Sequence, residues 1–235
     1  TAASIKNREI LVFMFPNRYF LARQAQTPNY TRGIRRAYPM SQYPDAHFIK
    51  SANARQQFVP DSGVEVAVAG RSNAGKSSAI NVIVNRRQFA RTSKTPGRTQ
   101  LVNFFSLSEG RRLVDLPGYG YAQVSDSMRE HWAELLGDYF RSRQSLRGLL
   151  LVVDIRRKIT DYDRQMMAFA EAVGLPVHIL LTKADKLKRG QAATAMLEVR
   201  KELGDRATVQ QFSALNRDGE DEARAVLERM LATPA

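Results

Sequence analysis

The sequence contains no cysteine, which excludes disulfide bonds, thiolate metal sites and cysteine nucleophiles. Long hydrophobic runs are also lacking. The apolar run 10–15 ends at Pro16 and is far too short to span a bilayer. No A-x-A-like cleavage site follows it promptly, so a signal peptide fits poorly as well. We therefore expect a cytoplasmic protein that does not enter a membrane.

Acidic residues are scarce relative to basic ones. The chain has 23 Asp and Glu against 36 Lys and Arg, which gives a net charge of +13 and a pI near 10.3. Over half of this excess lies in residues 1–60, which carry nine basic residues and two acids. Such a charge attracts polyanions in a salt-dependent way. Zinc-finger spacing and the aromatic signature of the common RNA-binding sheet are missing, so RNA contacts would be made through phosphates and shape.

Residues 70–77, GRSNAGKS, fill the phosphate-binding pattern G-x-x-x-x-G-K-[ST]. They follow the apolar run 64–69 and precede a helix-compatible segment, so the pattern stands between a predicted strand and a predicted helix. In that setting backbone N–H groups surround phosphate oxygens and Lys76 reaches the β and γ phosphates, while Ser77 is left to bind magnesium. An ordinary strand-to-helix turn is the alternative.

A second motif begins where the short apolar strand 111–115 ends in an acid. Asp115 opens the turn D-L-P-G, and beside the phosphate loop it would hold magnesium through water. Gly118 would offer its N–H to the γ phosphate. Taken alone, an Asp before Pro-Gly is as often a simple turn residue.

A third motif, TKAD at 182–185, follows the strand-like run 177–181 and indicates base selection. The Asp185 carboxylate can accept hydrogen bonds from the N1–H and the 2-amino group of guanine, and adenine offers neither donor. The stem of Lys183 would cover the base. A weaker fourth piece, Phe212–Ala214, would bring backbone N–H groups near guanine O6. In this order the pieces predict a GTP site, although TKAD alone is also typical of a solvated turn.

Together the segments GRSNAGKSS, TSKTPGRTQ, DLPGYG, TKAD and FSA resemble those of the EngB (YihA/YsxC) family of bacterial ribosome-biogenesis GTPases. This family belongs with the translation-factor-like GTPases that include Era, Der and MnmE. The resemblance runs from about residue 61 to 231, roughly three quarters of the chain. TSKTPGRTQ and DLPGYG are specific to this group, whereas many nucleotide enzymes share the phosphate loop.

The resemblance implies a monomeric GTPase that binds GTP and GDP with Mg²⁺ and acts in assembly of the large ribosomal subunit, in contact with its RNA. It also implies a need for the protein in normal cell division and septation. Thr99 is implied to join Ser77 on magnesium, although Thr95 lies close by, and Asn73 matches an asparagine that helps to bind potassium in related GTPases. Three residues are implied to be catalytic, namely Lys76, Thr99 and Gly118. The implied nucleotide-binding residues are Gly70, Arg71, Ser72, Asn73, Ala74, Gly75, Lys76, Ser77, Gly97, Arg98, Thr99, Gln100, Leu101, Asp115, Leu116, Pro117, Gly118, Thr182, Lys183, Ala184, Asp185, Phe212, Ser213 and Ala214.

Tyr119 departs from the pattern of many GTPases, which have at this position a glutamine that orients the attacking water. We expect that the tyrosine hydroxyl does not take over this role. Intrinsic hydrolysis is then slow, and the water is positioned by backbone, by a cation or by a partner surface.

Basic residues also gather in or beside the first switch, where a change of nucleotide would move them. Such a surface suits ribosomal RNA, and a solvated basic face is the alternative. These residues are Arg86, Arg87, Arg91, Lys94, Arg98, Arg111 and Arg112.

Strand-like and helix-like segments alternate beyond residue 60. They predict an α/β fold of the P-loop GTPase type, with a six-stranded, mostly parallel sheet, one antiparallel strand at an edge, and helices on both faces. The expected strands are 64–69, 101–107, 111–115, 149–154, 177–181 and 208–212. The expected helices are 76–84, 127–141, 161–173, 191–202 and 218–231. Every expected ligand then lies at or after the carboxyl end of a strand.

Residues 61–235 are expected to form a single GTPase domain, and residues 1–60 a basic N-terminal extension that is poorly ordered before Met40. Met40 begins a stretch that resembles the usual start of the family. Residues 1–39 are therefore interpreted as upstream sequence read through a misassigned start, with an organelle transit peptide as the alternative. Residues 39–60 read as an extended lead-in.

Two other functions stay open at this point. A P-loop ATPase or kinase accounts for the phosphate loop but not for the motif at 182–185. An RNA-binding protein with a vestigial nucleotide site accounts for the charge but leaves the phosphate loop without a role.

Overall fold

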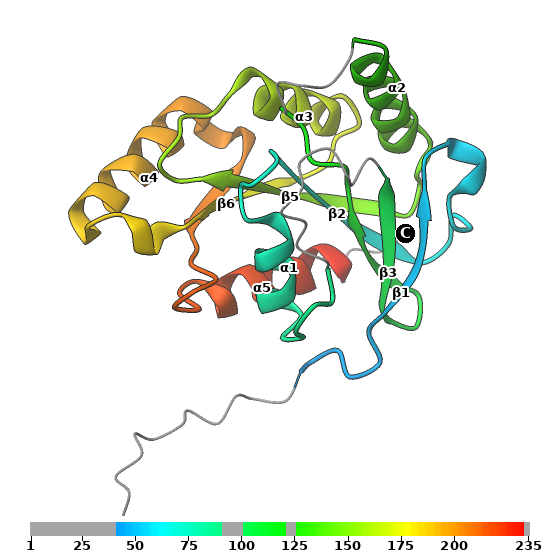
Figure 1. The fold of residues 1–235 in the computed structure, drawn as a ribbon, viewed down its shortest axis with the longest axis horizontal. Coiled ribbons are helices and arrows are strands. Elements are labelled where there is room, and N and C mark those ends of the chain that lie inside the picture. The colour runs from blue at the N-terminus through cyan, green and yellow to red at the C-terminus, as the bar shows by residue number, and fades with distance from the viewer. Residues whose placement is uncertain (1–40, 91–100, 121–125, 233–235) are drawn as a thin grey trace, which may run out of the picture. The chain divides into compact units, whose positions relative to one another are not determined.

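The apolar segments of the chain assemble into a sheet with helices on both of its faces (Figure 1). The computed structural model describes residues 41–90, 101–120 and 126–232. The extension expected before Met40 and most of the first switch lie outside these ranges. Within them the sheet has seven strands in the order β1-β3-β4-β2-β5-β6-β7. The strands are β1 (His47–Ala52), β2 (Val64–Gly70), β3 (Val102–Ser108), β4 (Arg111–Asp115), β5 (Leu146–Asp154), β6 (Val177–Thr182) and β7 (Thr208–Gln211).

The strand directions match the predicted sheet, but one strand was missed. β2, β4, β5, β6 and β7 are parallel, and β3 runs antiparallel to both of its neighbours, β4 and β1. The prediction of six strands with the reversed strand at the edge is therefore wrong in one respect, because β1 lies outside β3. Residues 39–60, expected to be a lead-in, supply this edge strand.

β1 was not predicted because its sequence lacks the alternation of polar and apolar residues that is typical of a strand. The first four residues of the strand, His47 to Lys50, are exposed, so polar and apolar residues do not alternate between a buried face and a solvated face. The strand is held instead by backbone pairing to β3, for example between Ser51 and Asn103. Prolines on either side further obscured it.

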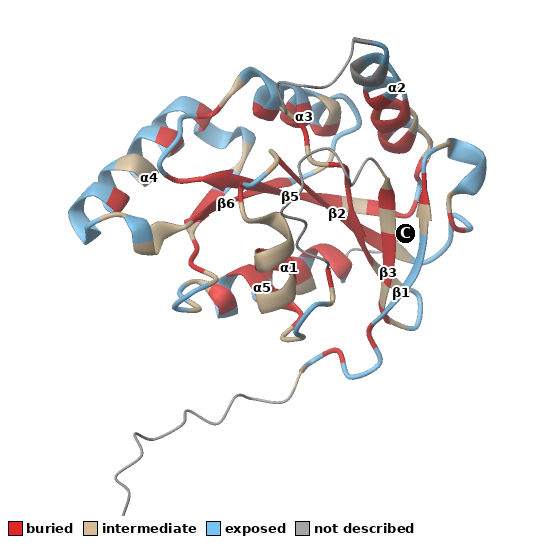
Figure 2. Ribbon diagram, in the orientation of Figure 1, coloured by how far each residue is buried: buried red, intermediate tan, exposed pale blue. Residues whose placement is uncertain are grey.

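Helices cover both faces of the sheet. α1 and α5 pack on one face, and α2, α3 and α4 pack on the other (Figure 1). Successive β2 residues point to opposite faces, so Val66 and Val68 contact one helical layer, while Ala67 and Ala69 contact the other. The strands are accordingly buried along most of their length (Figure 2). The helices are α1 (Lys76–Ile83), α2 (Asp126–Ser142), α3 (Asp161–Ala172), α4 (Arg189–Leu203) and α5 (Glu220–Leu231).

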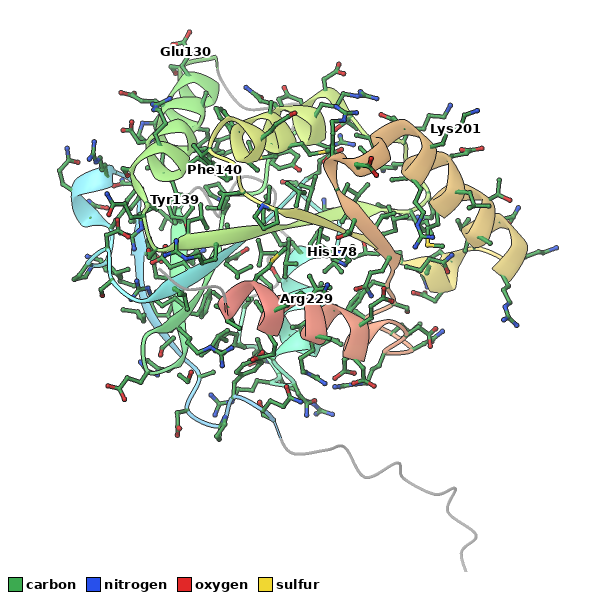
Figure 3. The ribbon with its side chains drawn as sticks, turned by 180° about the vertical axis from the view of Figure 1, so that it is seen from behind. Glu130, Tyr139, Phe140, His178, Lys201 and Arg229 are labelled. Atoms are coloured by element: carbon green, nitrogen blue, oxygen red, sulfur yellow. The ribbon has the colours of Figure 1, made fainter. Side chains whose placement is uncertain are left out.

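The end of the sheet where β2 begins contains a buried ionic cluster. Glu65 is fully buried, and its carboxylate accepts hydrogen bonds from Arg112 Nε at 2.7 Å, Arg143 Nε at 3.1 Å and the Tyr139 hydroxyl at 3.2 Å. Burial, followed by the charge of Glu65, raises the pKa of Tyr139 well above its usual value. Figure 3 shows Tyr139 and Phe140 on α2, and both are buried against the sheet. The cluster ties β2, β4 and α2 together.

None of the helices in the part of the chain that the structure describes has the length and apolarity needed to cross a membrane.

Candidate nucleotide-binding site

The loop between β2 and α1 has the backbone shape that the phosphate pattern predicts. Asn73 has φ 64° and Gly75 has φ 101°, a conformation that residues with a side chain rarely adopt. α1 begins at Lys76, and the Ala79 N–H is already bonded to Gly75 O at 2.9 Å. The N–H groups of the three residues before Ala79 have no intrahelical acceptor, so the helix start can bind an oxyanion.

Lys76 and Asp115 converge at the mouth of this loop. Lys76 Nζ forms an ion pair with Asp115 Oδ1, and the two side chains are only 10% and 7% exposed. Asp115 ends β4, and its Cα is paired with Val68 of the adjacent β2. The strand register thus places the two motifs next to each other, although they are far apart in the sequence.

The residues around this ion pair fit a magnesium ion. Ser77 supplies a hydroxyl on the first turn of α1, and Asp115 supplies a carboxylate. Mg²⁺ prefers such oxygen ligands, together with water and substrate phosphates, to a cage built from protein alone. The described ranges contain no cluster of three or more His, Cys, Asp or Glu residues that could hold a metal ion. Thr99, the third expected ligand, lies outside the described residues, as do Gly97, Arg98 and Gln100.

The turn after Asp115 contacts the phosphate loop directly. The Ser72 N–H donates to Tyr119 O at 2.9 Å, and a Cβ on Gly118 would lie 3.3 Å from Ser72 Oγ. Leu116 and Pro117 are buried, so their side chains belong to the core, and any contact with a nucleotide would come from their backbone. Leu101, at the other end of the first switch, is partly buried just before β3.

The Tyr119 side chain is buried against α3. Its side chain is 5% exposed, and its hydroxyl donates to Asp163 Oδ1 of α3 at 2.8 Å. Burial, and then the charge of Asp163, raises the pKa of this hydroxyl well above its usual value. The expectation that Tyr119 does not orient the attacking water is consistent with this geometry. Sequence reasoning gave no role to Asp163, which also caps α3 by accepting from the Thr160 N–H at 2.8 Å.

The TKAD segment lies against the phosphate loop. The buried Thr182 hydroxyl is within hydrogen-bond distance of Ala74 O and Val153 O, so this side chain connects strands and loop. Lys183 has φ 60°, and its Nζ donates to Asn73 O at 2.6 Å and to Asp154 Oδ2 at 2.9 Å. The lysine stem therefore runs from the base motif to the phosphate loop.

Asp185 is held by the fourth motif. Ser213 is fully buried, and its hydroxyl donates to Asp185 Oδ1 at 2.6 Å, while Lys186 Nζ lies 3.1 Å from Oδ2. The hydrogen bond from Ser213 is the main cause of the lowered pKa of Asp185. The Ala184 N–H bonds to Phe212 O at 3.2 Å, which joins the two motifs through their backbones. The carboxylate is therefore ionised, and its two oxygens are oriented by Ser213 and Lys186. Ala214 follows, partly buried.

Known proteins resemble this chain over most of its length. Residues 65–183 match the family model described as 50S ribosome-binding GTPase. A probable GTP-binding protein EngB of Stenotrophomonas maltophilia strain K279a is 52% identical over 186 residues, which span 77% of this chain and 93% of that protein.

Solved structures agree at the level of the fold. The crystal structure of a probable GTP-binding protein EngB has a TM-score of 0.58 at 19% identity, and the match covers 72% of this chain and 98% of that one. Era in complex with magnesium GDPNP and a fragment of 16S ribosomal RNA has a TM-score of 0.55 at 19% identity, with 71% and 56% covered. At this identity the structural likeness shows a shared fold.

Proposed function

Because this chain belongs to the EngB family of GTP-binding proteins, whose GTPase domain it carries, we propose that it is a GTP-driven switch that acts in the assembly of the large ribosomal subunit. The observation that carries the proposal is the ionised Asp185, held by Ser213 on one side of a phosphate loop whose lysine meets Asp115. An ATPase or kinase has no use for this guanine motif. A vestigial site is not expected to keep the phosphate loop, Asp115 and the guanine motif together, as the described residues do.

In the proposed complex the loop N–H groups and Lys76 neutralise the phosphates, and Asp185 accepts the two donors of guanine. The nucleotide-binding residues are those that the family resemblance implies. Mg²⁺ would be held by Ser77 and Thr99, and through water by Asp115, and it would supply positive charge that offsets the charge of the phosphates. Gly118 would offer its N–H to the γ phosphate. The ion pair of Lys76 with Asp115 then opens, because each partner gains a stronger one.

We further propose that hydrolysis is slow and uses potassium. Tyr119 is committed to Asp163, so no side chain at that position orients water. Asn73 is exposed on the phosphate loop and is available to a monovalent cation beside the phosphates. Such a cation would supply the positive charge that an arginine supplies in other GTPases.

Exchange of potassium for sodium is expected to slow GTP turnover by about 10²-fold, the order expected for losing one group that stabilises charge in the transition state. The measurement is phosphate release at saturating GTP in matched chloride salts. The variant Asn73→Ala is the internal control, since it should turn over at the same slow rate in both salts. Equal rates for the unaltered protein in the two salts would remove the potassium site.

The ribosomal part of the proposal rests on the family and on the net charge of +13. We expect the protein to sediment with large ribosomal subunits when loaded with a non-hydrolysable GTP analogue, and less so with GDP. Raising the salt concentration should weaken both complexes, because phosphate contacts release counterions. Sedimentation that ignores the nucleotide would contradict a switch. By the same family resemblance, we propose that depletion of the protein impairs ribosome assembly and, with it, cell division and septation.

A further inference from the structure

A polar pocket adjoins the nucleotide site. It has a volume of about 250 Å³ and lies between the phosphate loop and the loop that joins β5 to α3. Its walls include residues 71–74 and Lys183 from the nucleotide motifs. The rest of the lining comes from residues 152–163, which carry none of the GTP-binding motifs. The residues that define the two ends of the GTP site, Lys76 and Asp185, do not line it.

Cations outnumber anions around this pocket. Arg156, Arg157 and Lys158 are three consecutive exposed cations on the β5–α3 loop, and Arg71 and Lys183 stand on the phosphate-loop side. Against these five cations, the lining contains two carboxylates, Asp154 and Asp163. The pocket is therefore positively charged as a whole.

Asp154 is already satisfied by its neighbours. Arg156 donates to it through a fork, with Nε at 2.9 Å and Nη2 at 2.6 Å, and Lys183 Nζ lies 2.9 Å away. Burial alone would raise the pKa of Asp154, but the hydrogen bonds from Arg156 and Lys183 outweigh it and hold the pKa well below its usual value. Arg156 and Lys183 are consequently paired with Asp154 and are not available to a ligand.

Asp163 is satisfied as well, by the Tyr119 hydroxyl and by Thr160. Three cations are then left for a ligand. No ion pair or side-chain hydrogen bond joins Arg157 or Lys158 to any other described residue. Arg71 Nε is buried without a hydrogen-bond partner in the described part of the chain. A Cβ on Gly120 would lie 2.8 Å from this nitrogen, so it faces the turn after Asp115 rather than the open pocket, and only the rest of the Arg71 side chain lines the pocket.

We propose that this pocket binds a backbone phosphate of RNA, with Arg157 and Lys158 as its cationic ligands. The choice of RNA as the polyanion rests on the ribosomal function proposed above. The chemistry favours a phosphodiester over the carboxylates of an acidic protein, because a guanidinium and an ammonium flank a volume ample for a tetrahedral phosphate, and the hydroxyl of Ser72 adds a donor. RNA is read largely through phosphates and shape, which needs no base-specific motif.

The position of the pocket would couple this contact to the nucleotide. Lys183 bonds both to Asn73 of the phosphate loop and to Asp154 of the pocket. A phosphate seated beside them shares a wall with the GTP site and would be sensitive to rearrangement of the phosphate loop.

The test compares two charge-matched double variants of the full chain loaded with GDP. One carries Arg157→Ala and Lys158→Ala. The other carries Arg189→Ala and Lys201→Ala, which removes the same charge from exposed positions on α4, where Figure 3 shows Lys201. The probe is a short fluorescein-labelled single-stranded RNA, and its affinity is measured by anisotropy over a series of salt concentrations. A polyglutamate peptide is the second probe.

We expect the pocket variant to flatten the slope of log affinity against log salt by about 0.7, since the single phosphate contact that it removes contributes about 0.7 for single strands. The α4 variant should keep the slope of the unaltered protein. Equal losses in both variants would mean that only the overall charge matters, and loss of polyglutamate binding with RNA binding retained would mean an acidic protein partner; either result overturns the proposal. Affinity for GDP, measured on the same samples, separates this outcome from a failure of the nucleotide site.

Discussion

Replacement of Asp185 by asparagine should weaken the binding of GDP and GTP by roughly 10²- to 10⁴-fold, because two hydrogen bonds to a charged acceptor are worth about 1.5–3 kcal/mol each. The new amide would set a donor against the N1–H or the 2-amino group of guanine. Xanthine has a 2-oxo acceptor in place of the amino group, so the same variant should bind xanthosine diphosphate better than GDP. Titration calorimetry with both nucleotides measures the exchange of preference.

The contacts around Asp185 should be largely kept in this variant. Ser213 donates to Asp185 Oδ1, and its hydroxyl can donate equally to an amide oxygen, so the side chain should keep its orientation. Asp205→Asn, the same chemical change at an exposed position, is the control and should leave both affinities unaltered. Full guanine preference in the Asp185 variant would show that another group reads the base.

The sequence predicted the sheet and the site motifs where chemistry and periodicity coincide. The phosphate loop at 70–77 stands between a strand that is buried at every residue after its first and a helix, and both neighbours have a clear pattern. Strand-end acids such as Asp115 and Asp185 then follow from topology, because parallel strands bring their carboxyl ends to one edge. Each motif could be predicted from its own short segment of sequence, and the fold brings the motifs close together.

Features that depend on long-range partners were not predictable in this way. β1 is stabilised by backbone pairing to β3, and its exposed side chains carry no pattern. The contact between Ser213 and Asp185 joins residues 28 apart, and the one between Tyr119 and Asp163 joins residues 44 apart. In the sequence, Asp154 is only an acid at the end of an apolar strand. Its role depends on the contact with Lys183, which the sequence does not reveal.

The stability of the whole sheet should depend on Glu65, which lies far from the edge that carries the nucleotide site. Glu65 is fully buried, and the guanidinium groups of Arg112 and Arg143 and the Tyr139 hydroxyl converge on its carboxylate. Arg143 also donates to Val59 O at 2.8 Å and so fixes the chain before β2. Removing one partner of a buried charge pair leaves the other charge without compensation, which is far more costly than losing a surface ion pair.

Glu65→Ala should therefore lower the free energy of unfolding by about 3–5 kcal/mol and the melting temperature by about 10 °C or more. Urea denaturation followed by circular dichroism measures the loss. Glu65→Gln keeps hydrogen-bonding groups in place and should lose less, which separates the contribution of charge from that of shape. Glu109→Ala, in the exposed turn between β3 and β4, is the matched control and should stay within about 0.5 kcal/mol of the unaltered protein. If Glu65→Ala and Glu109→Ala were equally stable, the buried cluster would not hold β2, β4 and α2 together.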